Sequence, residues 1–191
     1  LIVDKTGIAT AVGTVVVNGN LTIISGTLNF ASSIVSVSGI TDIYDTITVS
    51  AFGPAGGPDT FGGLVTVHPG GNWHAGSSVL ADFNFENGIV ADGVSFVAGN
   101  GLYRFTTHDQ VVGGSLPLIF TDVELNSADV TLGTGMTIKG VLTLADNHLI
   151  TGSHDVYIRS TGSVTRTRAW VDGNLRKYCN PGSQMGTQEN A

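Results

Sequence analysis

The residues of this chain best suited to bind a metal ion are its five histidines. His68 and His74 lie six positions apart across a Pro-Gly-Gly turn, and His108 and His154 are each followed by an aspartate. Zinc sites need three or four converging ligands, commonly at local spacings such as H-x-x-x-H or C-x-x-C. Neither spacing occurs here, nor does the glycine-rich nonapeptide that binds calcium in some β-rolls. We therefore predict no metal site and no cofactor.

Acidic residues are the next candidates for chemistry. Stacked coils can bring Asp82, Asp109 or Asp129 together, and glycoside hydrolysis needs two carboxyl groups about 5–9 Å apart. The chain has only three glutamates, however, and only two basic residues precede position 139. We predict no catalytic residues and no enzymatic activity, with a carboxylate pair of this kind as the alternative.

Three aromatic residues, Trp73, Tyr103 and Trp170, are candidate platforms for stacking on sugar rings if they face outward. Gly70 and Gly71 before Trp73 indicate a turn, where a ring is easily exposed. The other interpretation is that these rings fill the core. A carbohydrate-binding module is thus a second functional hypothesis.

Charge is distributed unevenly along the chain. Residues 1–138 carry two basic and eleven acidic residues, a balance of −9, whereas residues 139–191 carry six basic and four acidic residues, a balance of +2, which together give the net −7. The basic end is either a solvated surface or an interface with the acidic end of a neighbouring subunit. A negative chain with few arginines is not expected to bind nucleic acid. The candidate interface charges are Arg159, Arg166, Arg168, Arg176 and Lys177.

Elements that would position these residues follow from the alternation of apolar and polar residues between Gly and Asn, as at 13–17 and 140–144. Such alternation predicts short strands joined by tight turns, and its recurrence predicts stacked coils. No stretch shows helical periodicity. We predict a single-domain, all-β parallel β-solenoid (a β-helix), right-handed, with three strands and about 20–25 residues per coil and roughly seven to nine coils.

The expected strands and inward side chains follow from the same alternation. The strands are expected at residues 13–17, 20–24, 27–30, 34–37, 43–49, 63–67, 79–85, 94–97, 102–106, 118–125, 129–132, 136–139, 141–144, 148–151, 155–158, 163–166 and 169–176. The inward side chains are expected to be Val15, Val17, Leu21, Ile23, Leu28, Phe30, Val35, Val37, Val65, Val67, Phe83, Phe85, Phe96, Phe105, Phe120, Val123, Leu125, Val130, Leu132, Ile138, Leu142, Leu144, Leu149, Val156 and Ile158.

The solenoid is expected to cover residues 1–178. Residues 1–12 are a candidate N-terminal cap, residues 51–60, with two prolines and three glycines, a loop inserted into a coil, and residues 179–191 a polar tail. Cys179 is the only cysteine, so no internal disulfide can form. No apolar run approaches the roughly 20 residues of a membrane-spanning helix, and no signal peptide is recognisable.

Residues 61–178, about two thirds of the chain, carry an ordered series of phrases. They are FGGLVTV (61–67), GNW (71–73), GLYRF (101–105), QVVGG (110–114), IFTDVEL (119–125), VTL (130–132), GVLTL (140–144), GSVTR (162–166) and WVDGNLRK (170–177). This series resembles the β-solenoid segments of large secreted surface proteins of Bacteroidota, many of them exported by the type IX route. The resemblance implies a non-enzymatic stalk or adhesive region outside the cell. Two features depart from it: the short polar end after Lys177 and the missing sorting domain.

The function expected from the sequence is therefore structural. We predict an extracellular or cell-surface building block of an adhesin, stalk or filament, with end-to-end self-association as a homo-oligomer or with neighbouring domains of a longer surface protein as partners. The alternative is a carbohydrate-binding surface module with glycans as partners. Self-association without ligand would favour the first, and monomeric glycan binding the second.

Overall fold

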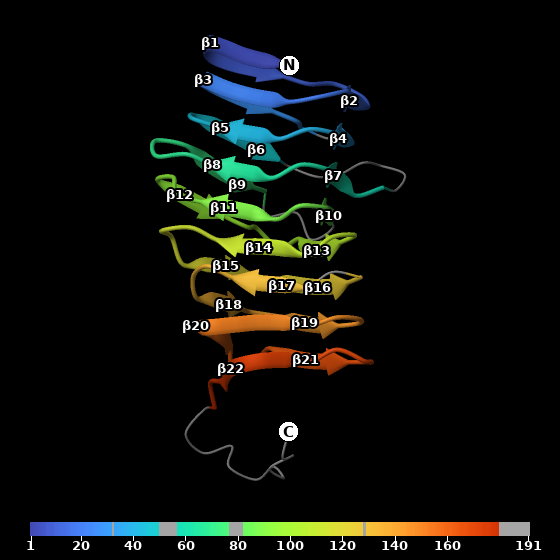
Figure 1. Cartoon of the computed structure of the whole chain (residues 1–191). Coiled ribbons are helices and arrows are strands. Elements are labelled where there is room, and N and C mark those ends of the chain that lie inside the picture. Colours follow the sequence, from blue (N-terminus) through green and yellow to red (C-terminus); the bar gives the residue numbers. More distant parts are fainter. Residues whose placement is uncertain (32, 50–56, 77–81, 128, 180–191) are drawn as a thin grey trace.

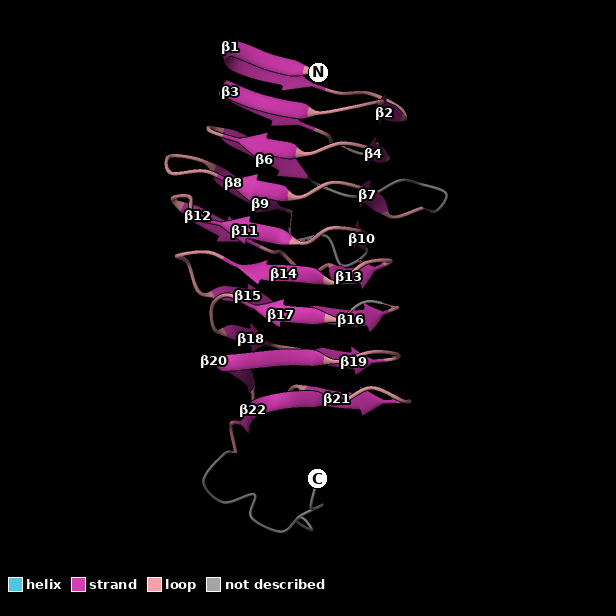
Figure 2. Ribbon diagram, viewed as in Figure 1, coloured by secondary structure: helices cyan, strands magenta, loops and turns pink. Residues whose placement is uncertain are grey.

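The computed structural model describes residues 1–31, 33–49, 57–76, 82–127 and 129–179, and these form strands but no helix (Figure 2). Figure 1 shows the strands stacked along one axis, with the N-terminus at the top and the C-terminus at the bottom. Since no described residue is helical, none belongs to a helix able to cross a membrane. The strands are β1 (Ile2–Thr10), β2 (Val15–Val17), β3 (Leu21–Asn29), β4 (Val35–Val37), β5 (Thr41–Ile43), β6 (Thr46–Val49), β7 (Asp59–Phe61), β8 (Val65–Val67), β9 (Asn72–Ala75), β10 (Asp82–Phe85), β11 (Ile89–Ala91), β12 (Ser95–Val97), β13 (Leu102–Thr106), β14 (Gln110–Gly113), β15 (Leu118–Phe120), β16 (Asp122–Asn126), β17 (Val130–Leu132), β18 (Met136–Ile138), β19 (Val141–Leu144), β20 (Leu149–Ile158), β21 (Ser163–Arg166) and β22 (Val171–Lys177).

Each coil contributes one segment to each of three faces. Face A contains β5, β8, β11, β14 and β17, face B contains β6, β9, β12, β15 and β18, and face C contains β2, β4, β7, β10, β13, β16, β19 and β21. The long strands β1, β3, β20 and β22 bend around the corner, so their first halves lie in face A and their second halves in face B. Every pairing between described strands is parallel, as when like segments of successive coils lie side by side.

The register gives the length of a coil directly. Val37 pairs with Phe61, 24 residues later, and Phe85 pairs with Phe105, 20 residues later. These intervals agree with the expected 20–25 residues, and the chain completes about eight turns. The structure thus confirms the prediction of an all-β parallel solenoid with three strands per coil.

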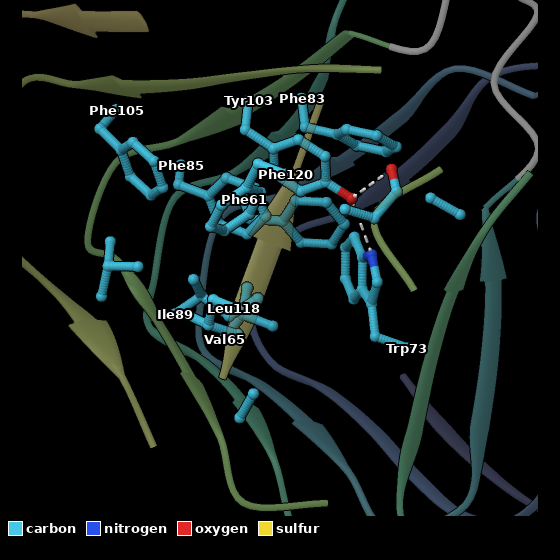
Figure 3. Packing of buried hydrophobic residues seen from close by; sticks show 14 of the residues in the cluster. Phe61, Val65, Trp73, Phe83, Phe85, Ile89, Tyr103, Phe105, Leu118 and Phe120 are labelled. Atoms are coloured by element: carbon cyan, nitrogen blue, oxygen red, sulfur yellow. Dashed lines mark hydrogen bonds between the residues drawn. The ribbon is translucent and has the colours of Figure 1, made fainter. Parts of the chain in front are cut away.

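Inward-facing side chains fill the space between the three faces. All of the residues expected to face inward are buried except Val15 and Phe96, which are partly buried against the same core. The widest part of the core is aromatic: Phe61, Phe85 and Phe105 occupy one position of face C in successive coils, with ring centroids 5.5 and 5.7 Å apart (Figure 3). Stacking of like side chains at the strand spacing therefore holds successive coils together as well as closing each one.

Face B is interrupted between β12 and β15. The hydrogen-bonded order of strands ends with β12 on one side and with β15 on the other, although the neighbouring pairs β11–β14 and β13–β16 are intact on faces A and C. Side chains bridge this break instead. Phe96 packs edge-on against Phe120 with 5.5 Å between ring centroids, and the Thr121 hydroxyl donates to the Gly99 carbonyl at 2.8 Å.

Several predicted boundaries are wrong. Most of residues 1–12, expected as a cap, form β1, which pairs with β3 as an ordinary ladder strand. The corner of β3 is made by Gly26, where φ is +81° and a Cβ atom would collide with the Lys5 carbonyl oxygen. The expected strands 43–49 and 118–125 are each divided by a corner, at residues 44–45 and at Thr121.

Two predicted segments fall largely outside the described residues. Of the loop expected at 51–60, Asp59 and Thr60 belong to β7, so the final part of that prediction is wrong, and residues 50–56 are not described. Of the polar tail expected at 179–191, only Cys179 is described, as an exposed free thiol.

Candidate functional site

Two of the three aromatic rings proposed to stack on sugars are in the core. Trp73, on β9, and Tyr103, on β13, are completely buried. Their polar atoms are satisfied inside: the Trp73 indole N–H donates to the Tyr103 hydroxyl at 3.0 Å, and that hydroxyl donates to the Ala98 carbonyl at 3.2 Å (Figure 3). The prediction of sugar-stacking platforms is therefore wrong for both, because alternation along the strand directs each ring inward.

Trp170 is the ring of this set that lies at the surface. It sits just before β22, is 52% exposed, and lies 3.9 Å from the His148 ring, centroid to centroid. The Asp129 carboxylate contacts His148 Nδ1 at 3.1 Å and accepts the His148 backbone N–H at 2.7 Å. The Trp170 ring is thus held at the corner leading into face A and is accessible from outside.

The five charges proposed as a subunit interface lie in two places. Arg166 ends β21 on face C, where it is paired in register with Leu144, and Arg168 lies in the following turn. Arg159 follows β20, and Arg176 and Lys177 end β22, all three at or beside face B. The basic C-terminal region is therefore divided between two sides of the solenoid.

Face B carries a cluster that combines these cations with exposed aromatic rings. We define the face-B basic cluster as Lys139, Tyr157, Arg159, Arg176, Lys177 and Tyr178. Tyr157 pairs in register with Arg176, and the Tyr157 and Tyr178 rings are 5.8 Å apart. A hollow of about 200 Å³ is lined by the two tyrosines, Arg176 and Lys177.

Cation–ring and ion-pair contacts order this cluster. The guanidinium carbon of Arg176 lies 5.7 Å from the centre of the Tyr157 ring, and that of Arg159 lies 6.0 Å from the centre of the Tyr178 ring. Arg176 Nε is 3.0 Å from Asp155 Oδ1, while the Tyr157 hydroxyl donates to Asp155 Oδ2 at 2.9 Å. One carboxylate therefore orients both an arginine and a tyrosine.

A second hollow, of about 420 Å³, lies at the break in face B. Its walls come from His74, Phe96, Val97, Ile119 and Lys139, together with residues 98–100. Lys139 also belongs to the face-B basic cluster, so the groove and the cluster meet at this side chain. The outer surface of face B is hollowed at both places.

The acidic residues considered for catalysis have partners elsewhere. Asp82, on face C, is bound by Arg104 Nη1 at 2.7 Å, and Arg104 Nε also contacts Glu124 at 2.9 Å. Asp129 contacts His148, as described above, and Asp109 precedes β14 one coil earlier. Within the described ranges, no group of three or more His, Cys, Asp or Glu side chains is arranged to hold a metal ion.

Asp59 is the one buried carboxylate in the described part of the chain. It occupies an inward position of face C, paired with Phe83 of the next coil, and is only 2% exposed. Asp59 Oδ1 accepts the Val35 backbone N–H at 2.8 Å, whereas Oδ2 has no hydrogen-bond partner. Burial raises the pKa of this carboxyl from 3.8 to about 6, and the hydrogen bond from Val35 partly opposes that rise.

Sequence reasoning missed Lys139 and the two tyrosines of the face-B basic cluster. Tyr157 and Tyr178 are 21 positions apart, which is one coil length, and Tyr178 N–H donates to the Ile158 carbonyl at 2.9 Å. Aligning the last two coils on Ile158 and Lys177 would have brought these rings together. The coil length was known only approximately, however, so the neighbours could not be assigned.

Comparison of the chain with known protein families, with curated proteins and with solved structures found no match. The resemblance to secreted surface proteins of Bacteroidota therefore stays a prediction. The functional argument depends on the geometry alone.

Proposed function

We propose that this chain is a non-catalytic, extracellular structural module, a rigid section of a surface adhesin, stalk or filament. The observation that carries the proposal is the unbroken parallel pairing of face C, in which eight strands follow one another without a gap. Seven spacings of about 4.8 Å make this ladder about 34 Å long. Because every coil is bonded to its neighbours, the module resists bending as one body.

The ends of the ladder suit a module that is joined to others. Among the described strands, β1 and β2 pair only with the following coil, and β21 and β22 only with the preceding one. Open strand edges pair readily with further strands. A coil from the same chain, from a neighbouring domain or from another copy can therefore continue the stack, which is how we expect a homo-oligomer or a longer stalk to form.

The proposal is tested by location and shape. Antibodies against the folded chain are expected to label intact cells that produce it, and the purified protein is expected to form short rods or rows of rods in negative-stain electron microscopy. Labelling only after the cells are permeabilised would contradict the extracellular assignment. Flexible or spherical particles would contradict the rod.

A further inference from the structure

The face-B basic cluster collects half of the positive charge of the chain. Lys139, Arg159, Arg176 and Lys177 are four of only eight Lys and Arg residues in a protein of net charge −7. All four side chains are exposed. In the contacts described above, one carboxylate, Asp155, lies among them, so the cluster keeps a clear positive excess. Such an excess on a negative protein favours an anionic partner.

The cations are arranged in rows along the solenoid axis. The backbone N–H groups of Lys139, Arg159 and Tyr178 donate to the Phe120, Ile138 and Ile158 carbonyls, respectively, so the three residues occupy one corner position in successive coils. Arg176 lies beside this row, in register with Tyr157. Successive coils are about 4.8 Å apart, so the rows present charge to a linear ligand that runs along the axis rather than to a single small ion.

The aromatic rings give the cluster a second means of recognition. Tyr178 is 54% exposed, and the Tyr157 and Tyr178 rings line the open hollow of about 200 Å³. Tyrosine combines an apolar face, on which a sugar ring can pack, with a hydroxyl that forms hydrogen bonds. The Asp155 carboxylate beside them can accept hydrogen bonds from hydroxyl groups. Cations, ring faces and one acceptor together match a polymer that bears both acidic and hydroxyl groups.

We propose that the face-B basic cluster binds a linear acidic polysaccharide, whose carboxylate or sulfate groups are held by Arg159, Arg176 and Lys139 and whose rings pack on Tyr157 and Tyr178. Nucleic acid fits less well, because the Asp155 carboxylate repels closely spaced phosphates. A second copy of this chain also fits less well. Residues 1–29 carry only Asp4 and Lys5 as charged side chains, so the first coil offers no acidic surface to match the cluster.

The test compares two pairs of arginines by titrating the folded protein with polygalacturonate, dextran sulfate, neutral dextran and a single-stranded DNA oligonucleotide. The double variant R159Q/R176Q is expected to bind the acidic polysaccharide about tenfold more weakly, which is about 1.4 kcal/mol. The matched control R166Q/R168Q removes the same charge from the other side of the solenoid and is expected to change the affinity less than twofold. Whichever acidic polymer binds more tightly identifies carboxylate or sulfate as the preferred group.

Tyrosine variants separate ring packing from charge. Tyr157→Ala is expected to weaken polysaccharide binding severalfold, while Tyr157→Phe keeps the ring and most of the affinity. Several results would overturn the proposal: no binding of either acidic polymer, equal loss in both arginine pairs, or tighter binding of the oligonucleotide than of both polysaccharides. Sedimentation showing that R159Q/R176Q dissociates an oligomer would assign the surface to a second copy instead. None of these results depends on whether the chain is a rigid surface module.

Discussion

Removing the buried carboxylate of Asp59 is expected to change how stability depends on pH. The pKa of this group is about 6 in the fold against an ordinary value of 3.8, so between these values the folded chain binds more protons than the unfolded chain. The free energy of unfolding therefore falls as pH rises through this window. The difference between 6 and 3.8, at about 1.4 kcal/mol for each pKa unit, gives a full penalty of about 3 kcal/mol above the window.

The isosteric variant Asp59→Asn isolates this penalty. Its side-chain oxygen can still accept the Val35 N–H, but it cannot ionise. Since the unfolded-state carboxyl is already partly ionised at pH 4, about 2 kcal/mol of the penalty develops between pH 4 and pH 7. We expect the stability of Asp59→Asn relative to wild type to improve by this amount over that range, as measured by urea unfolding with Trp fluorescence. Asp59→Leu, which suits the surrounding apolar positions, is expected to lose the same pH dependence.

The comparison is decisive because only the difference between the curves is used. Every other titrating group is common to the two proteins, so its contribution cancels. Parallel curves for wild type and Asp59→Asn between pH 4 and pH 7 would refute the reasoning. They would mean that the carboxyl is hydrated or hydrogen-bonded in solution.

Three further substitutions test the core and the packing of the coils by urea unfolding. Tyr103→Phe leaves the buried Trp73 indole N–H without its acceptor and is expected to cost about 1–3 kcal/mol; a change below about 0.5 kcal/mol would mean that the N–H finds another partner. Phe85→Ala removes a ring from the middle of the aromatic column and is expected to cost about 3–5 kcal/mol, so a near-neutral effect would contradict its inward position. Gly63→Ala places a Cβ atom 2.5 Å from the Gly39 backbone and is expected to destabilise the coil, whereas Gly57→Ala meets nothing within 4 Å and serves as the control; equal effects would show that the coils can separate locally.

Much of the fold followed from the sequence because alternation and glycine spacing are local signals. They located inward residues such as Phe83, Phe85 and Phe120, which are buried. The missed strands are those in which the local signal fails. β7 carries Asp59 at an inward position, so its apolar alternation is lost, and β9 (Asn72–Ala75) has one large apolar side chain among polar ones. Pairing with neighbouring coils forms both strands, and that pairing cannot be read from one segment.

The surface was harder to predict than the core, since it depends on which coil lies next to which. Alternation left Trp73 either inside or outside, because a shift of one residue reverses every side chain in a strand. Likewise, the five basic residues near the C-terminus looked like one set in sequence. The corner between β20 and β21 places Arg159 by face B and Arg166 on face C. An error of one or two residues in the coil length is enough to exchange such neighbours.

The break between β12 and β15 gives the chain one place where its length can change. Elsewhere on the three faces, inserting a residue before a strand would shift a bonded register and turn core side chains outward. The segment from Gly114 to Pro117 instead leads into β15, whose side toward β12 has no ladder to disturb. Insertions and deletions in this segment should therefore accumulate during evolution without loss of the fold, and the outline of the groove beside it should vary among descendants while faces A and C stay constant.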